Sequence, residues 1–447
     1  MPVKLIFFSL ATIALIACTG RYHQSNNSAG ILFKNVNFIN GSGNAPQEHT
    51  DILIRGDTIA AIGKNLDSAY ATVINLEGKT MMPAIISAHV HVGVLRGLAT
   101  DAANYTRENI LSQLIKYAHY GVLHVQVMGT DRPLLFRNGL YDSIRMGLLP
   151  GARMLSAGYG FGVPEQNINP SSFLSLLYRP STTEAIPSQM DSLSKLKTEL
   201  VKIWVDDFGG TAKKMEPSIY QSIILEAHKR NMRVAAHLYY LSDARKLVGE
   251  GLDIIAHSIR DSVVDDAFLL EMKAKKVIYI PTLSLDEFSF IYAREPEWIN
   301  DPFFKASLEP GVYELITSEK YRNDLMHAPA YARNAAGFKI ALINLKKIAD
   351  AGITIALGTD SGAMPVRAQG FSEHLEMALM VEAGITPLQA IAIATKNASE
   401  ALGIDNRYGL LEKGKMADLL ILNADPSADI KNTRNIASVY KAGKKIN

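Results

Sequence analysis

Apolar runs of strand length alternate with amphipathic stretches of helix length across residues 84–400. This alternation is typical of a parallel α/β fold, because a crossover helix must return the chain to the start of each parallel strand. We identify eight strand-like runs, which read AIISAHVHV, GVLHVQVMG, ARMLSAG, LVKIWVDD, RVAAHL, DIIAHS, VIYIPTL and TIALGTD. Eight such runs with helices between them favour a (β/α)8 TIM-like barrel over an open sheet.

The two ends of the chain differ from this central part. Residues 31–83 and 401–447 contain short, β-prone runs separated by turn clusters such as GSGNAP. We predict one small β-sandwich domain built from both ends, which brackets a barrel at 84–400. The segment from about 285 to 335 is longer than an ordinary βα loop, so we expect it to form an insertion over the active face.

The overall composition limits the choice of partner. The chain has 447 residues and a formal net charge of +2, with 46 Lys and Arg against 44 Asp and Glu. Such a balance does not favour nucleic acid as a partner. We expect a small-molecule substrate, and the sequence leaves the oligomeric state open, a homo-oligomer included.

The N-terminus reads as an export signal. Residues 1–17 combine a basic start with the apolar run LIFFSLATIALIA, which is short for a membrane span. The run ends in Leu-Ile-Ala-Cys, which resembles a bacterial lipobox, and Cys18 is the single cysteine of the chain. We predict lipidation of Cys18 and a tether over residues 18–30, with a plain secretory signal or a buried helix as alternatives. The protein would then lie in the cell envelope, periplasmic or at the cell surface, held to the membrane only by its lipid.

Two histidines lie one residue apart in the first strand-like run. His89 and His91 project from the same face of a strand, and two buried imidazoles are unfavourable unless their nitrogens are bound. Further polar residues lie on later runs, near the ends where barrel active sites are built. The set is His89, His91, Lys202, His237, His257 and Asp360. Four imidazoles and a carboxylate suit zinc or a similar divalent ion.

Each of these residues also has a structural interpretation. A single strand histidine can be a hydrogen-bonded core residue, and Lys202 can reach solvent from a strand end. Asp360, in GTDSG, can cap a turn. Their joint occurrence on successive strands is what favours a metal site.

These motifs resemble the amidohydrolase superfamily of metal-dependent hydrolases, in its imidazolonepropionase-like and prolidase-like branch. The resemblance spans about residues 31–446 and includes EGKTMMPAIISAHVHVG, VKIWVDD, VAAHL, IIAHS, ALGTDSG and MVEAGITPLQAIAIATKNASEALG. Ser87 departs from it, because relatives often have an aspartate at that position.

The resemblance implies a role for each site residue. His89 and His91 would bind the more buried metal, and Lys202, carboxylated by carbon dioxide, would bridge two ions. His237 and His257 would bind the second ion, and Asp360 would touch the metal site and move protons. We expect one or two divalent ions, zinc before others, which would activate water for attack on a carbonyl.

The expected reaction is hydrolysis of a C–N amide bond in a dipeptide, an N-acyl amino acid or a cyclic amide. Hydrolysis of an ester, lactone or phosphoester on the same scaffold is an alternative, and so is a non-catalytic binding lipoprotein. Specificity resides in loops after the strands. We expect substrate contacts from Tyr239, Tyr240, Arg260 and His374, although a nearby acid could instead pair with Arg260.

Overall fold

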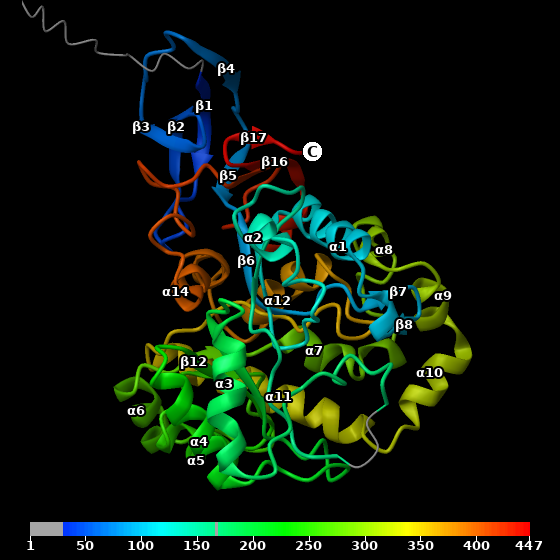
Figure 1. Ribbon diagram of the computed structural model, residues 1–447. Helices are drawn as coiled ribbons and strands as arrows, with labels where there is room; N and C mark the ends of the chain where they lie inside the picture. Colours follow the sequence, from blue (N-terminus) through cyan, green and yellow to red (C-terminus); the bar gives the residue numbers. More distant parts are fainter. Residues whose placement is uncertain (1–29, 166–168) are drawn as a thin grey trace, which may run out of the picture.

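Strands from both ends of the chain form one sheet at one end of the molecule (Figure 1). The computed structural model describes residues 30–165 and 169–447. The sheet contains β1 (Gly30–Phe38), β2 (Gln47–Arg55), β3 (Thr58–Gly63), β4 (Ala71–Asn75), β5 (Thr80–Pro83), β15 (Leu419–Leu422), β16 (Ile436–Lys441) and β17 (Lys444–Lys445). Antiparallel pairing of β5 with β15 joins the two ends of the chain. The expected β-sandwich is not confirmed, because hydrogen bonds join these eight strands into a single sheet.

Parallel strands form the central part of the molecule. They are β6 (Ile85–Val90), β9 (Val122–Val127), β10 (Arg153–Ser156), β11 (Leu200–Trp204), β12 (Arg233–His237), β13 (Ile254–Ala256) and β14 (Ile278–Ile280). β6 pairs with β9, and β9 with β10. The strands β11 to β14 pair in chain order. All seven lie within the runs identified in the sequence, because consecutive β-branched residues favour buried parallel strands.

Three bridges close these strands into a ring. Phe161, just beyond β10, forms a parallel bridge with Ile203 of β11. The run TIALGTDS, residues 354–361, lies between β14 and β6, with parallel bridges from Ile355 to Tyr279 and from Ser361 to Val90. It is bound by isolated bridges and not by a regular ladder, yet it occupies the eighth position. The fold is therefore TIM-barrel-like.

Helices connect successive strands around this ring. They are α1 (Arg107–His119), α2 (Leu140–Arg145), α3 (Ile186–Ser194), α4 (Pro217–His228), α5 (Leu241–Gly249) and α6 (Asp266–Ala274). The stretch from β14 to the eighth strand contains α7 (Leu283–Phe288), α8 (Pro302–Ser307), α9 (Val312–Thr317), α10 (Glu319–Met326) and α11 (Tyr331–Asp350). The chain continues with α12 (Phe371–Glu382), α13 (Pro387–Ala392), the π-helical turn η4 (Ile393–Asn397) and α14 (Ala398–Leu402). Local sequence fixes several helix starts: the Thr106 side chain caps α1, and Thr386 and Gln389 form a capping box on α13.

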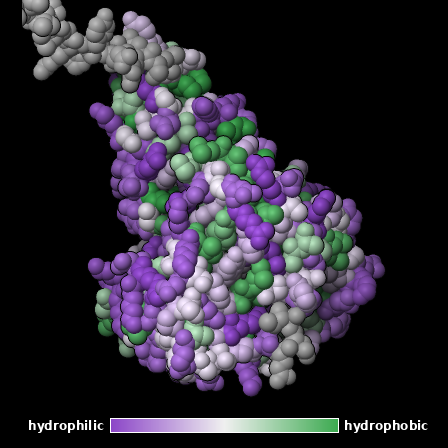
Figure 2. Space-filling view, viewed as in Figure 1, coloured by the Kyte–Doolittle hydropathy of each residue, from purple (hydrophilic) through white to green (hydrophobic). Residues whose placement is uncertain are grey.

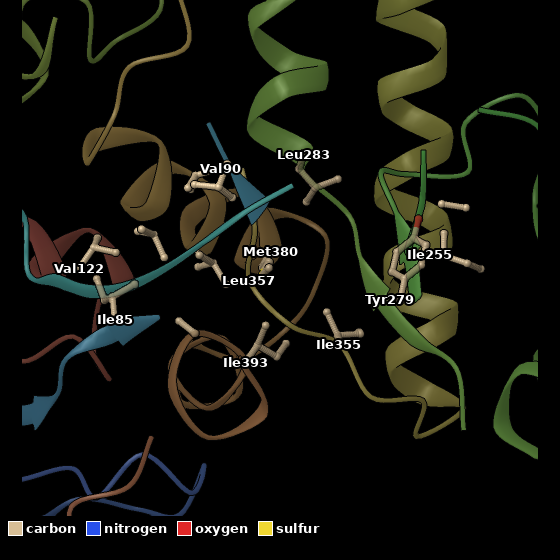
Figure 3. Close-up of a cluster of buried hydrophobic side chains, with 14 of the residues drawn as sticks. Ile85, Val90, Val122, Ile255, Tyr279, Leu283, Ile355, Leu357, Met380 and Ile393 are labelled. Atoms are coloured by element: carbon tan, nitrogen blue, oxygen red, sulfur yellow. The ribbon is translucent and has the colours of Figure 1, made fainter. Parts of the chain in front are cut away.

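The main core lies between the strands and the surrounding helices. Figure 3 shows part of it, where Ile85 and Val90 of β6 lie in one cluster with Met380 of α12 and Ile393 of η4. Val90 is fully buried there, while its neighbours His89 and His91 are directed to the other face of the strand. Packing against the helices thus fixes which face of β6 presents its histidines.

The predicted signal segment and Cys18 lie in residues 1–29, outside the described part of the chain. Within residues 30–165 and 169–447, no helix combines the length and the apolar character needed to cross a bilayer. Figure 2 shows hydrophobic residues on one face of the molecule in separate small groups among hydrophilic ones.

Candidate metal centre

Three of the predicted residues meet in one buried group. The Nε2 atoms of His89 and His91 lie 3.1 Å and 2.8 Å from Oδ1 of Asp360. One ligand atom from each of the three residues lies within 4.8 Å of the others, and all three residues are buried. Residues 89 and 360 are far apart in sequence, and the closure of the barrel brings them together. The group has a composition and spacing that could hold a divalent metal ion.

The two later histidines continue this group. The ring centroid of His257 lies 4.7 Å from that of His89 and 4.4 Å from that of His237. His237 Nε2 also lies 3.4 Å from a carboxylate oxygen of Asp206, a residue that was not among the predicted site residues. The ring centroid of His91 lies 5.8 Å from that of His89, so the four imidazoles form a continuous row near the strand ends.

Hydroxyl groups orient two of the rings. Nδ1 of His91 lies 2.6 Å from Oγ1 of Thr130, and Nδ1 of His257 lies 2.9 Å from Oγ1 of Thr282. A hydroxyl at Nδ1 fixes the ring orientation and leaves Nε2 for the site, which is the usual arrangement around a metal-binding histidine. Neither threonine could be recognised from the sequence, because each follows a different strand from the one that its histidine follows.

Burial favours the neutral, metal-binding form of these imidazoles. Desolvation, followed by the charge of Lys202, lowers the pKa of His89 from 6.5 to about 3. Desolvation likewise lowers the pKa of His257 well below its usual range. Nδ1 of His89 is buried and has no hydrogen-bond partner among the described residues.

Lys202 is enclosed beneath the same site. Its side chain is 1% exposed, and its Nζ has no hydrogen-bond partner within the described ranges. Burial lowers the pKa of its amine from 10.5 to about 7, against an opposing effect of Asp360. A buried amine without a partner is unfavourable as it stands, so the side chain fits a further ligand or modification at Nζ.

Asp360 has an unusual backbone conformation. Its φ is +57°, and two other residues at nearby strand ends, His257 and Thr282, have φ values of +90° and +54°. Strained non-glycine residues of this kind cluster at functional sites, where the surrounding structure enforces them. Burial on its own would raise the pKa of Asp360, but Arg367, which contacts Oδ2, and the two histidines hold it well below its usual range.

A buried glutamate supports this strand end. Oε1 of Glu373, on α12, accepts hydrogen bonds from Thr359 at 2.7 Å, Ser361 at 3.0 Å and Ser87 at 3.1 Å. Thr359 and Ser361 flank Asp360, and Ser87 lies two residues before His89. Glu373 thus joins the first and eighth strands directly behind the candidate ligands, and Ser87 supplies a donor to it.

Replacing Glu373 with alanine should lower the free energy of unfolding by about 2–4 kcal/mol, because buried hydroxyls lose their acceptor. Glu373→Gln should cost about half as much, since the amide oxygen still accepts. Urea unfolding in a chelator measures both without a contribution from metal. Glu382→Ala, at the exposed end of the same helix, is the control and should change stability by less than about 0.5 kcal/mol. Equal effects of the alanine substitutions at 373 and 382 would contradict the role of this network.

The site opens into a pocket of about 340 Å³. Its lining includes His89, His91, His237, His257 and Asp360, together with Phe173, Leu174, Trp204, Asp206, Phe208, Tyr239, Tyr240, Arg260, Leu285, Asp286, Ser289, Arg333, Met364 and Arg367. Leu285, Asp286, Ser289 and Arg333 belong to the long segment at 285–335, so the expected contribution of this insertion to the active face is confirmed.

Three of the four predicted substrate contacts line this pocket. Tyr240 donates a hydrogen bond to Asp207 at 3.1 Å, and the ring of Tyr239 lies 4.8 Å from the Arg260 guanidinium. Arg260 itself forms an ion pair of 2.8 Å with the buried Asp286. The alternative of a structural partner for Arg260 is therefore the observed one, although the partner is Asp286 and not the adjacent Asp261.

The prediction that His374 contacts the substrate, the fourth of these contacts, is wrong. His374 is fully buried, does not line the pocket, and uses both ring nitrogens elsewhere. Nδ1 lies 2.9 Å from Oγ1 of Thr433, and Nε2 lies 2.9 Å from the carbonyl oxygen of Tyr120. The helical periodicity of α12 turns this side chain toward the core, a direction that its place in the sequence did not reveal.

The burial of His374 predicts a pH effect on stability. Desolvation lowers its pKa from 6.5 to about 3, so the unfolded chain binds a proton that the folded chain does not. Stability is then lost as the pH falls from about 6.5 toward 3, by up to about 1.4 kcal/mol per pH unit. His374→Gln should flatten this slope in urea titrations run with chelator, while His119→Gln, at an exposed position, should not. An unchanged slope in the His374 variant would show that other groups account for the acid sensitivity.

Comparison with known proteins agrees with this architecture. A sequence model of the amidohydrolase family matches residues 80–446 of this chain. A 5-methylthioadenosine/S-adenosylhomocysteine deaminase of Thermococcus kodakarensis is 25% identical over 417 residues, which cover 88% of this chain and 85% of that enzyme. An imidazolonepropionase of Deinococcus deserti is 36% identical over 107 residues, 23% of this chain and 26% of the enzyme.

Solved structures show the same fold. The structure of a Xaa-Pro dipeptidase with bound methionine in its active site covers 94% of this chain and 100% of its own, with a TM-score of 0.72 and 23% identity. The resemblance drawn from the motifs is thereby confirmed. The chain belongs to the amidohydrolase family and is an enzyme that hydrolyses carbon–nitrogen bonds.

Proposed function

We propose that this enzyme hydrolyses the C–N bond of an amide, in a dipeptide, an N-acyl amino acid or a cyclic amide. The observation that supports this most directly is the meeting of His89, His91 and Asp360 in one buried group at the bottom of a pocket. Imidazole and carboxylate ligands around an accessible cavity are the elements of a hydrolytic metal centre.

The donor set fits one or two divalent ions, with zinc expected. His89, His91 and Asp360 would hold one ion, and His237 and His257 the other, with a carboxylated Lys202 between them. The unpartnered Nζ of Lys202 supports this proposal, because a carbamate would supply the ligand oxygens that a buried amine lacks. When bound, such ions lower the pKa of water and polarise a carbonyl group.

The protein's own residues would position the substrate and move protons. Asp360 presents Oδ1 to the two histidines, and Arg367 contacts Oδ2, so the carboxylate is fixed at the base of the pocket. A carboxylate held in this way can accept a proton from water and deliver it to the leaving nitrogen. Tyr239 and Tyr240 lie on the wall beside this base, where they would contact the substrate.

We also propose that the enzyme works in the cell envelope, anchored through a lipid on Cys18 after removal of residues 1–17. The apolar segment that ends in Leu-Ile-Ala-Cys supports this proposal. Mass spectrometry of the mature N-terminus from membranes tests it, since a lipid-modified Cys18 is expected, whereas an intact Met1 or a cleavage site elsewhere would contradict it.

A substrate panel tests the reaction. Full-length protein in mild detergent, supplied with zinc and bicarbonate, should hydrolyse members of the dipeptide, N-acyl amino acid or cyclic amide classes, and a chelator should abolish turnover. Esters, lactones, phosphoesters and adenosine-type amines form the other arms of the panel. Turnover confined to one of those arms would show that the enzyme catalyses that reaction and not the proposed one. Absence of both turnover and bound metal would favour a binding protein.

A further inference from the structure

Three arginines line the pocket, and two of them are neutralised by carboxylates. Arg260 pairs with Asp286 at 2.8 Å, and Arg367 pairs with Asp360. The third, Arg333, makes neither an ion pair nor a side-chain hydrogen bond with any described residue. A guanidinium that faces a substrate pocket without a counter-charge is available for an anion that arrives with the substrate.

Arg333 lines the pocket while much of its side chain remains exposed to solvent. It lies in the first turn of α11, and its guanidinium is 5.9 Å from the ring of Tyr239, which also contacts Arg260. Gly209 lies close to the guanidinium of Arg333: a Cβ at position 209 would lie 2.5 Å from Nη1 of Arg333. The absence of a side chain at 209 therefore lets the loop after β11 approach the guanidinium closely.

An acidic residue of that loop, Asp207, already has hydrogen-bond partners. Asp207 accepts hydrogen bonds from the Tyr240 hydroxyl at 3.1 Å and from the Gly209 backbone at 3.1 Å. Oδ2 of Asp206 lies 3.4 Å from Nε2 of His237. Each carboxylate thus has another partner through one of its oxygens, and neither forms an ion pair with Arg333 in the described part of the chain.

We propose that Arg333 binds a carboxylate of the substrate, and that this residue selects amides with a free carboxylate over neutral ones. The inference rests on the proposed amide hydrolysis and narrows its substrate class to amides that carry a free carboxylate, such as N-acyl amino acids and dipeptides. A guanidinium binds a carboxylate through two parallel hydrogen bonds, which gives orientation as well as affinity. Phe173, Leu174, Phe208 and Met364 supply apolar lining for the acyl side of such a molecule.

Two matched substrates test this inference in the full-length, zinc-loaded enzyme. One is an N-acyl amino acid, and the other is the same molecule with its carboxylate converted to a carboxamide. Arg333→Met should raise KM for the carboxylate about 10- to 100-fold, with kcat changed by less than about threefold. The same variant should leave kcat/KM for the carboxamide nearly unchanged, and Arg333→Lys should recover part of the loss. Lys339→Met, an exposed position on the same helix, is the control and should affect neither substrate.

Calorimetry with a ketomethylene analogue pair, which cannot be cleaved, gives a second readout that does not depend on turnover. Tighter binding of the carboxylate form, lost in Arg333→Met, supports the inference. Equal binding of the two forms, or an equal effect of the substitution on both, overturns it even if amides are hydrolysed. If carboxylate-selective binding is found without hydrolysis of any amide, the proposed reaction fails while the role of Arg333 stands.

Discussion

Replacement of Asp360 with asparagine is expected to lower kcat about 10²- to 10⁴-fold in enzyme that retains its metal, because an amide cannot accept and return a proton. The substitution is otherwise conservative. Asparagine tolerates the positive φ of +57° at this position, and its oxygen can still accept from Arg367. The expected loss therefore reports on the proton at Asp360 and not on a rearranged strand end.

The measurement is steady-state kinetics at saturating substrate, with zinc content determined on the same samples. Asp266→Asn, at an exposed position on α6, is the control and should leave kcat unchanged. If Asp360→Asn binds a full complement of zinc and keeps the wild-type kcat, the proposed proton transfer by Asp360 is wrong.

Replacement of Lys202 with alanine should remove the bridging ligand and lower both zinc occupancy and activity, the latter by about 100-fold or more. The side chain is enclosed, so its removal leaves a space beside the histidines that a short carboxylic acid can enter. Acetate or propionate should therefore restore occupancy and part of the activity, since either supplies the two oxygens of the missing carbamate.

Zinc analysis and activity across a series of added carboxylic acids measure this effect. Lys195→Ala, an exposed lysine before β11, controls for loss of a positive charge and should show neither defect nor rescue. Unchanged zinc occupancy in Lys202→Ala would refute a bridging role for this residue. A loss of occupancy that no acid restores would leave Lys202 with a purely structural role.

The barrel strands and the proposed ligands could be predicted because their signals are local. A run of β-branched residues favours a buried strand wherever it lies, and function in such folds gathers at the carboxyl ends of strands. His89, His91, His237 and His257 could thus be placed in one site without knowledge of any contact between them. The eighth strand position, residues 354–361, is the least regular, yet Gly358 and Asp360 still indicated the end of a strand there.

The surroundings of each side chain could not be predicted in this way, because they depend on residues that are remote in sequence. Arg260 could not be assigned until Asp286 was seen beside it, and His374 was misplaced because the direction of one helix face depends on how α12 packs. Glu373 gave no sequence signal at all, since its partners come from the first and eighth strands, which are neighbours in the ring but far apart in the sequence.

The sequence by itself indicated the order of strands and the polar residues near their ends, because short-range periodicity and residue type are enough for these. The class of chemistry and the roles of the six residues proposed to bind metal came from the resemblance of the motifs to a known family. Only the tertiary structure decided which charges are already paired, because pairing depends on distances of a few ångströms between distant segments. Arg333 illustrates the difference: one arginine among many in the sequence, it differs from the other two in the pocket because the fold gives them carboxylates and leaves it without one.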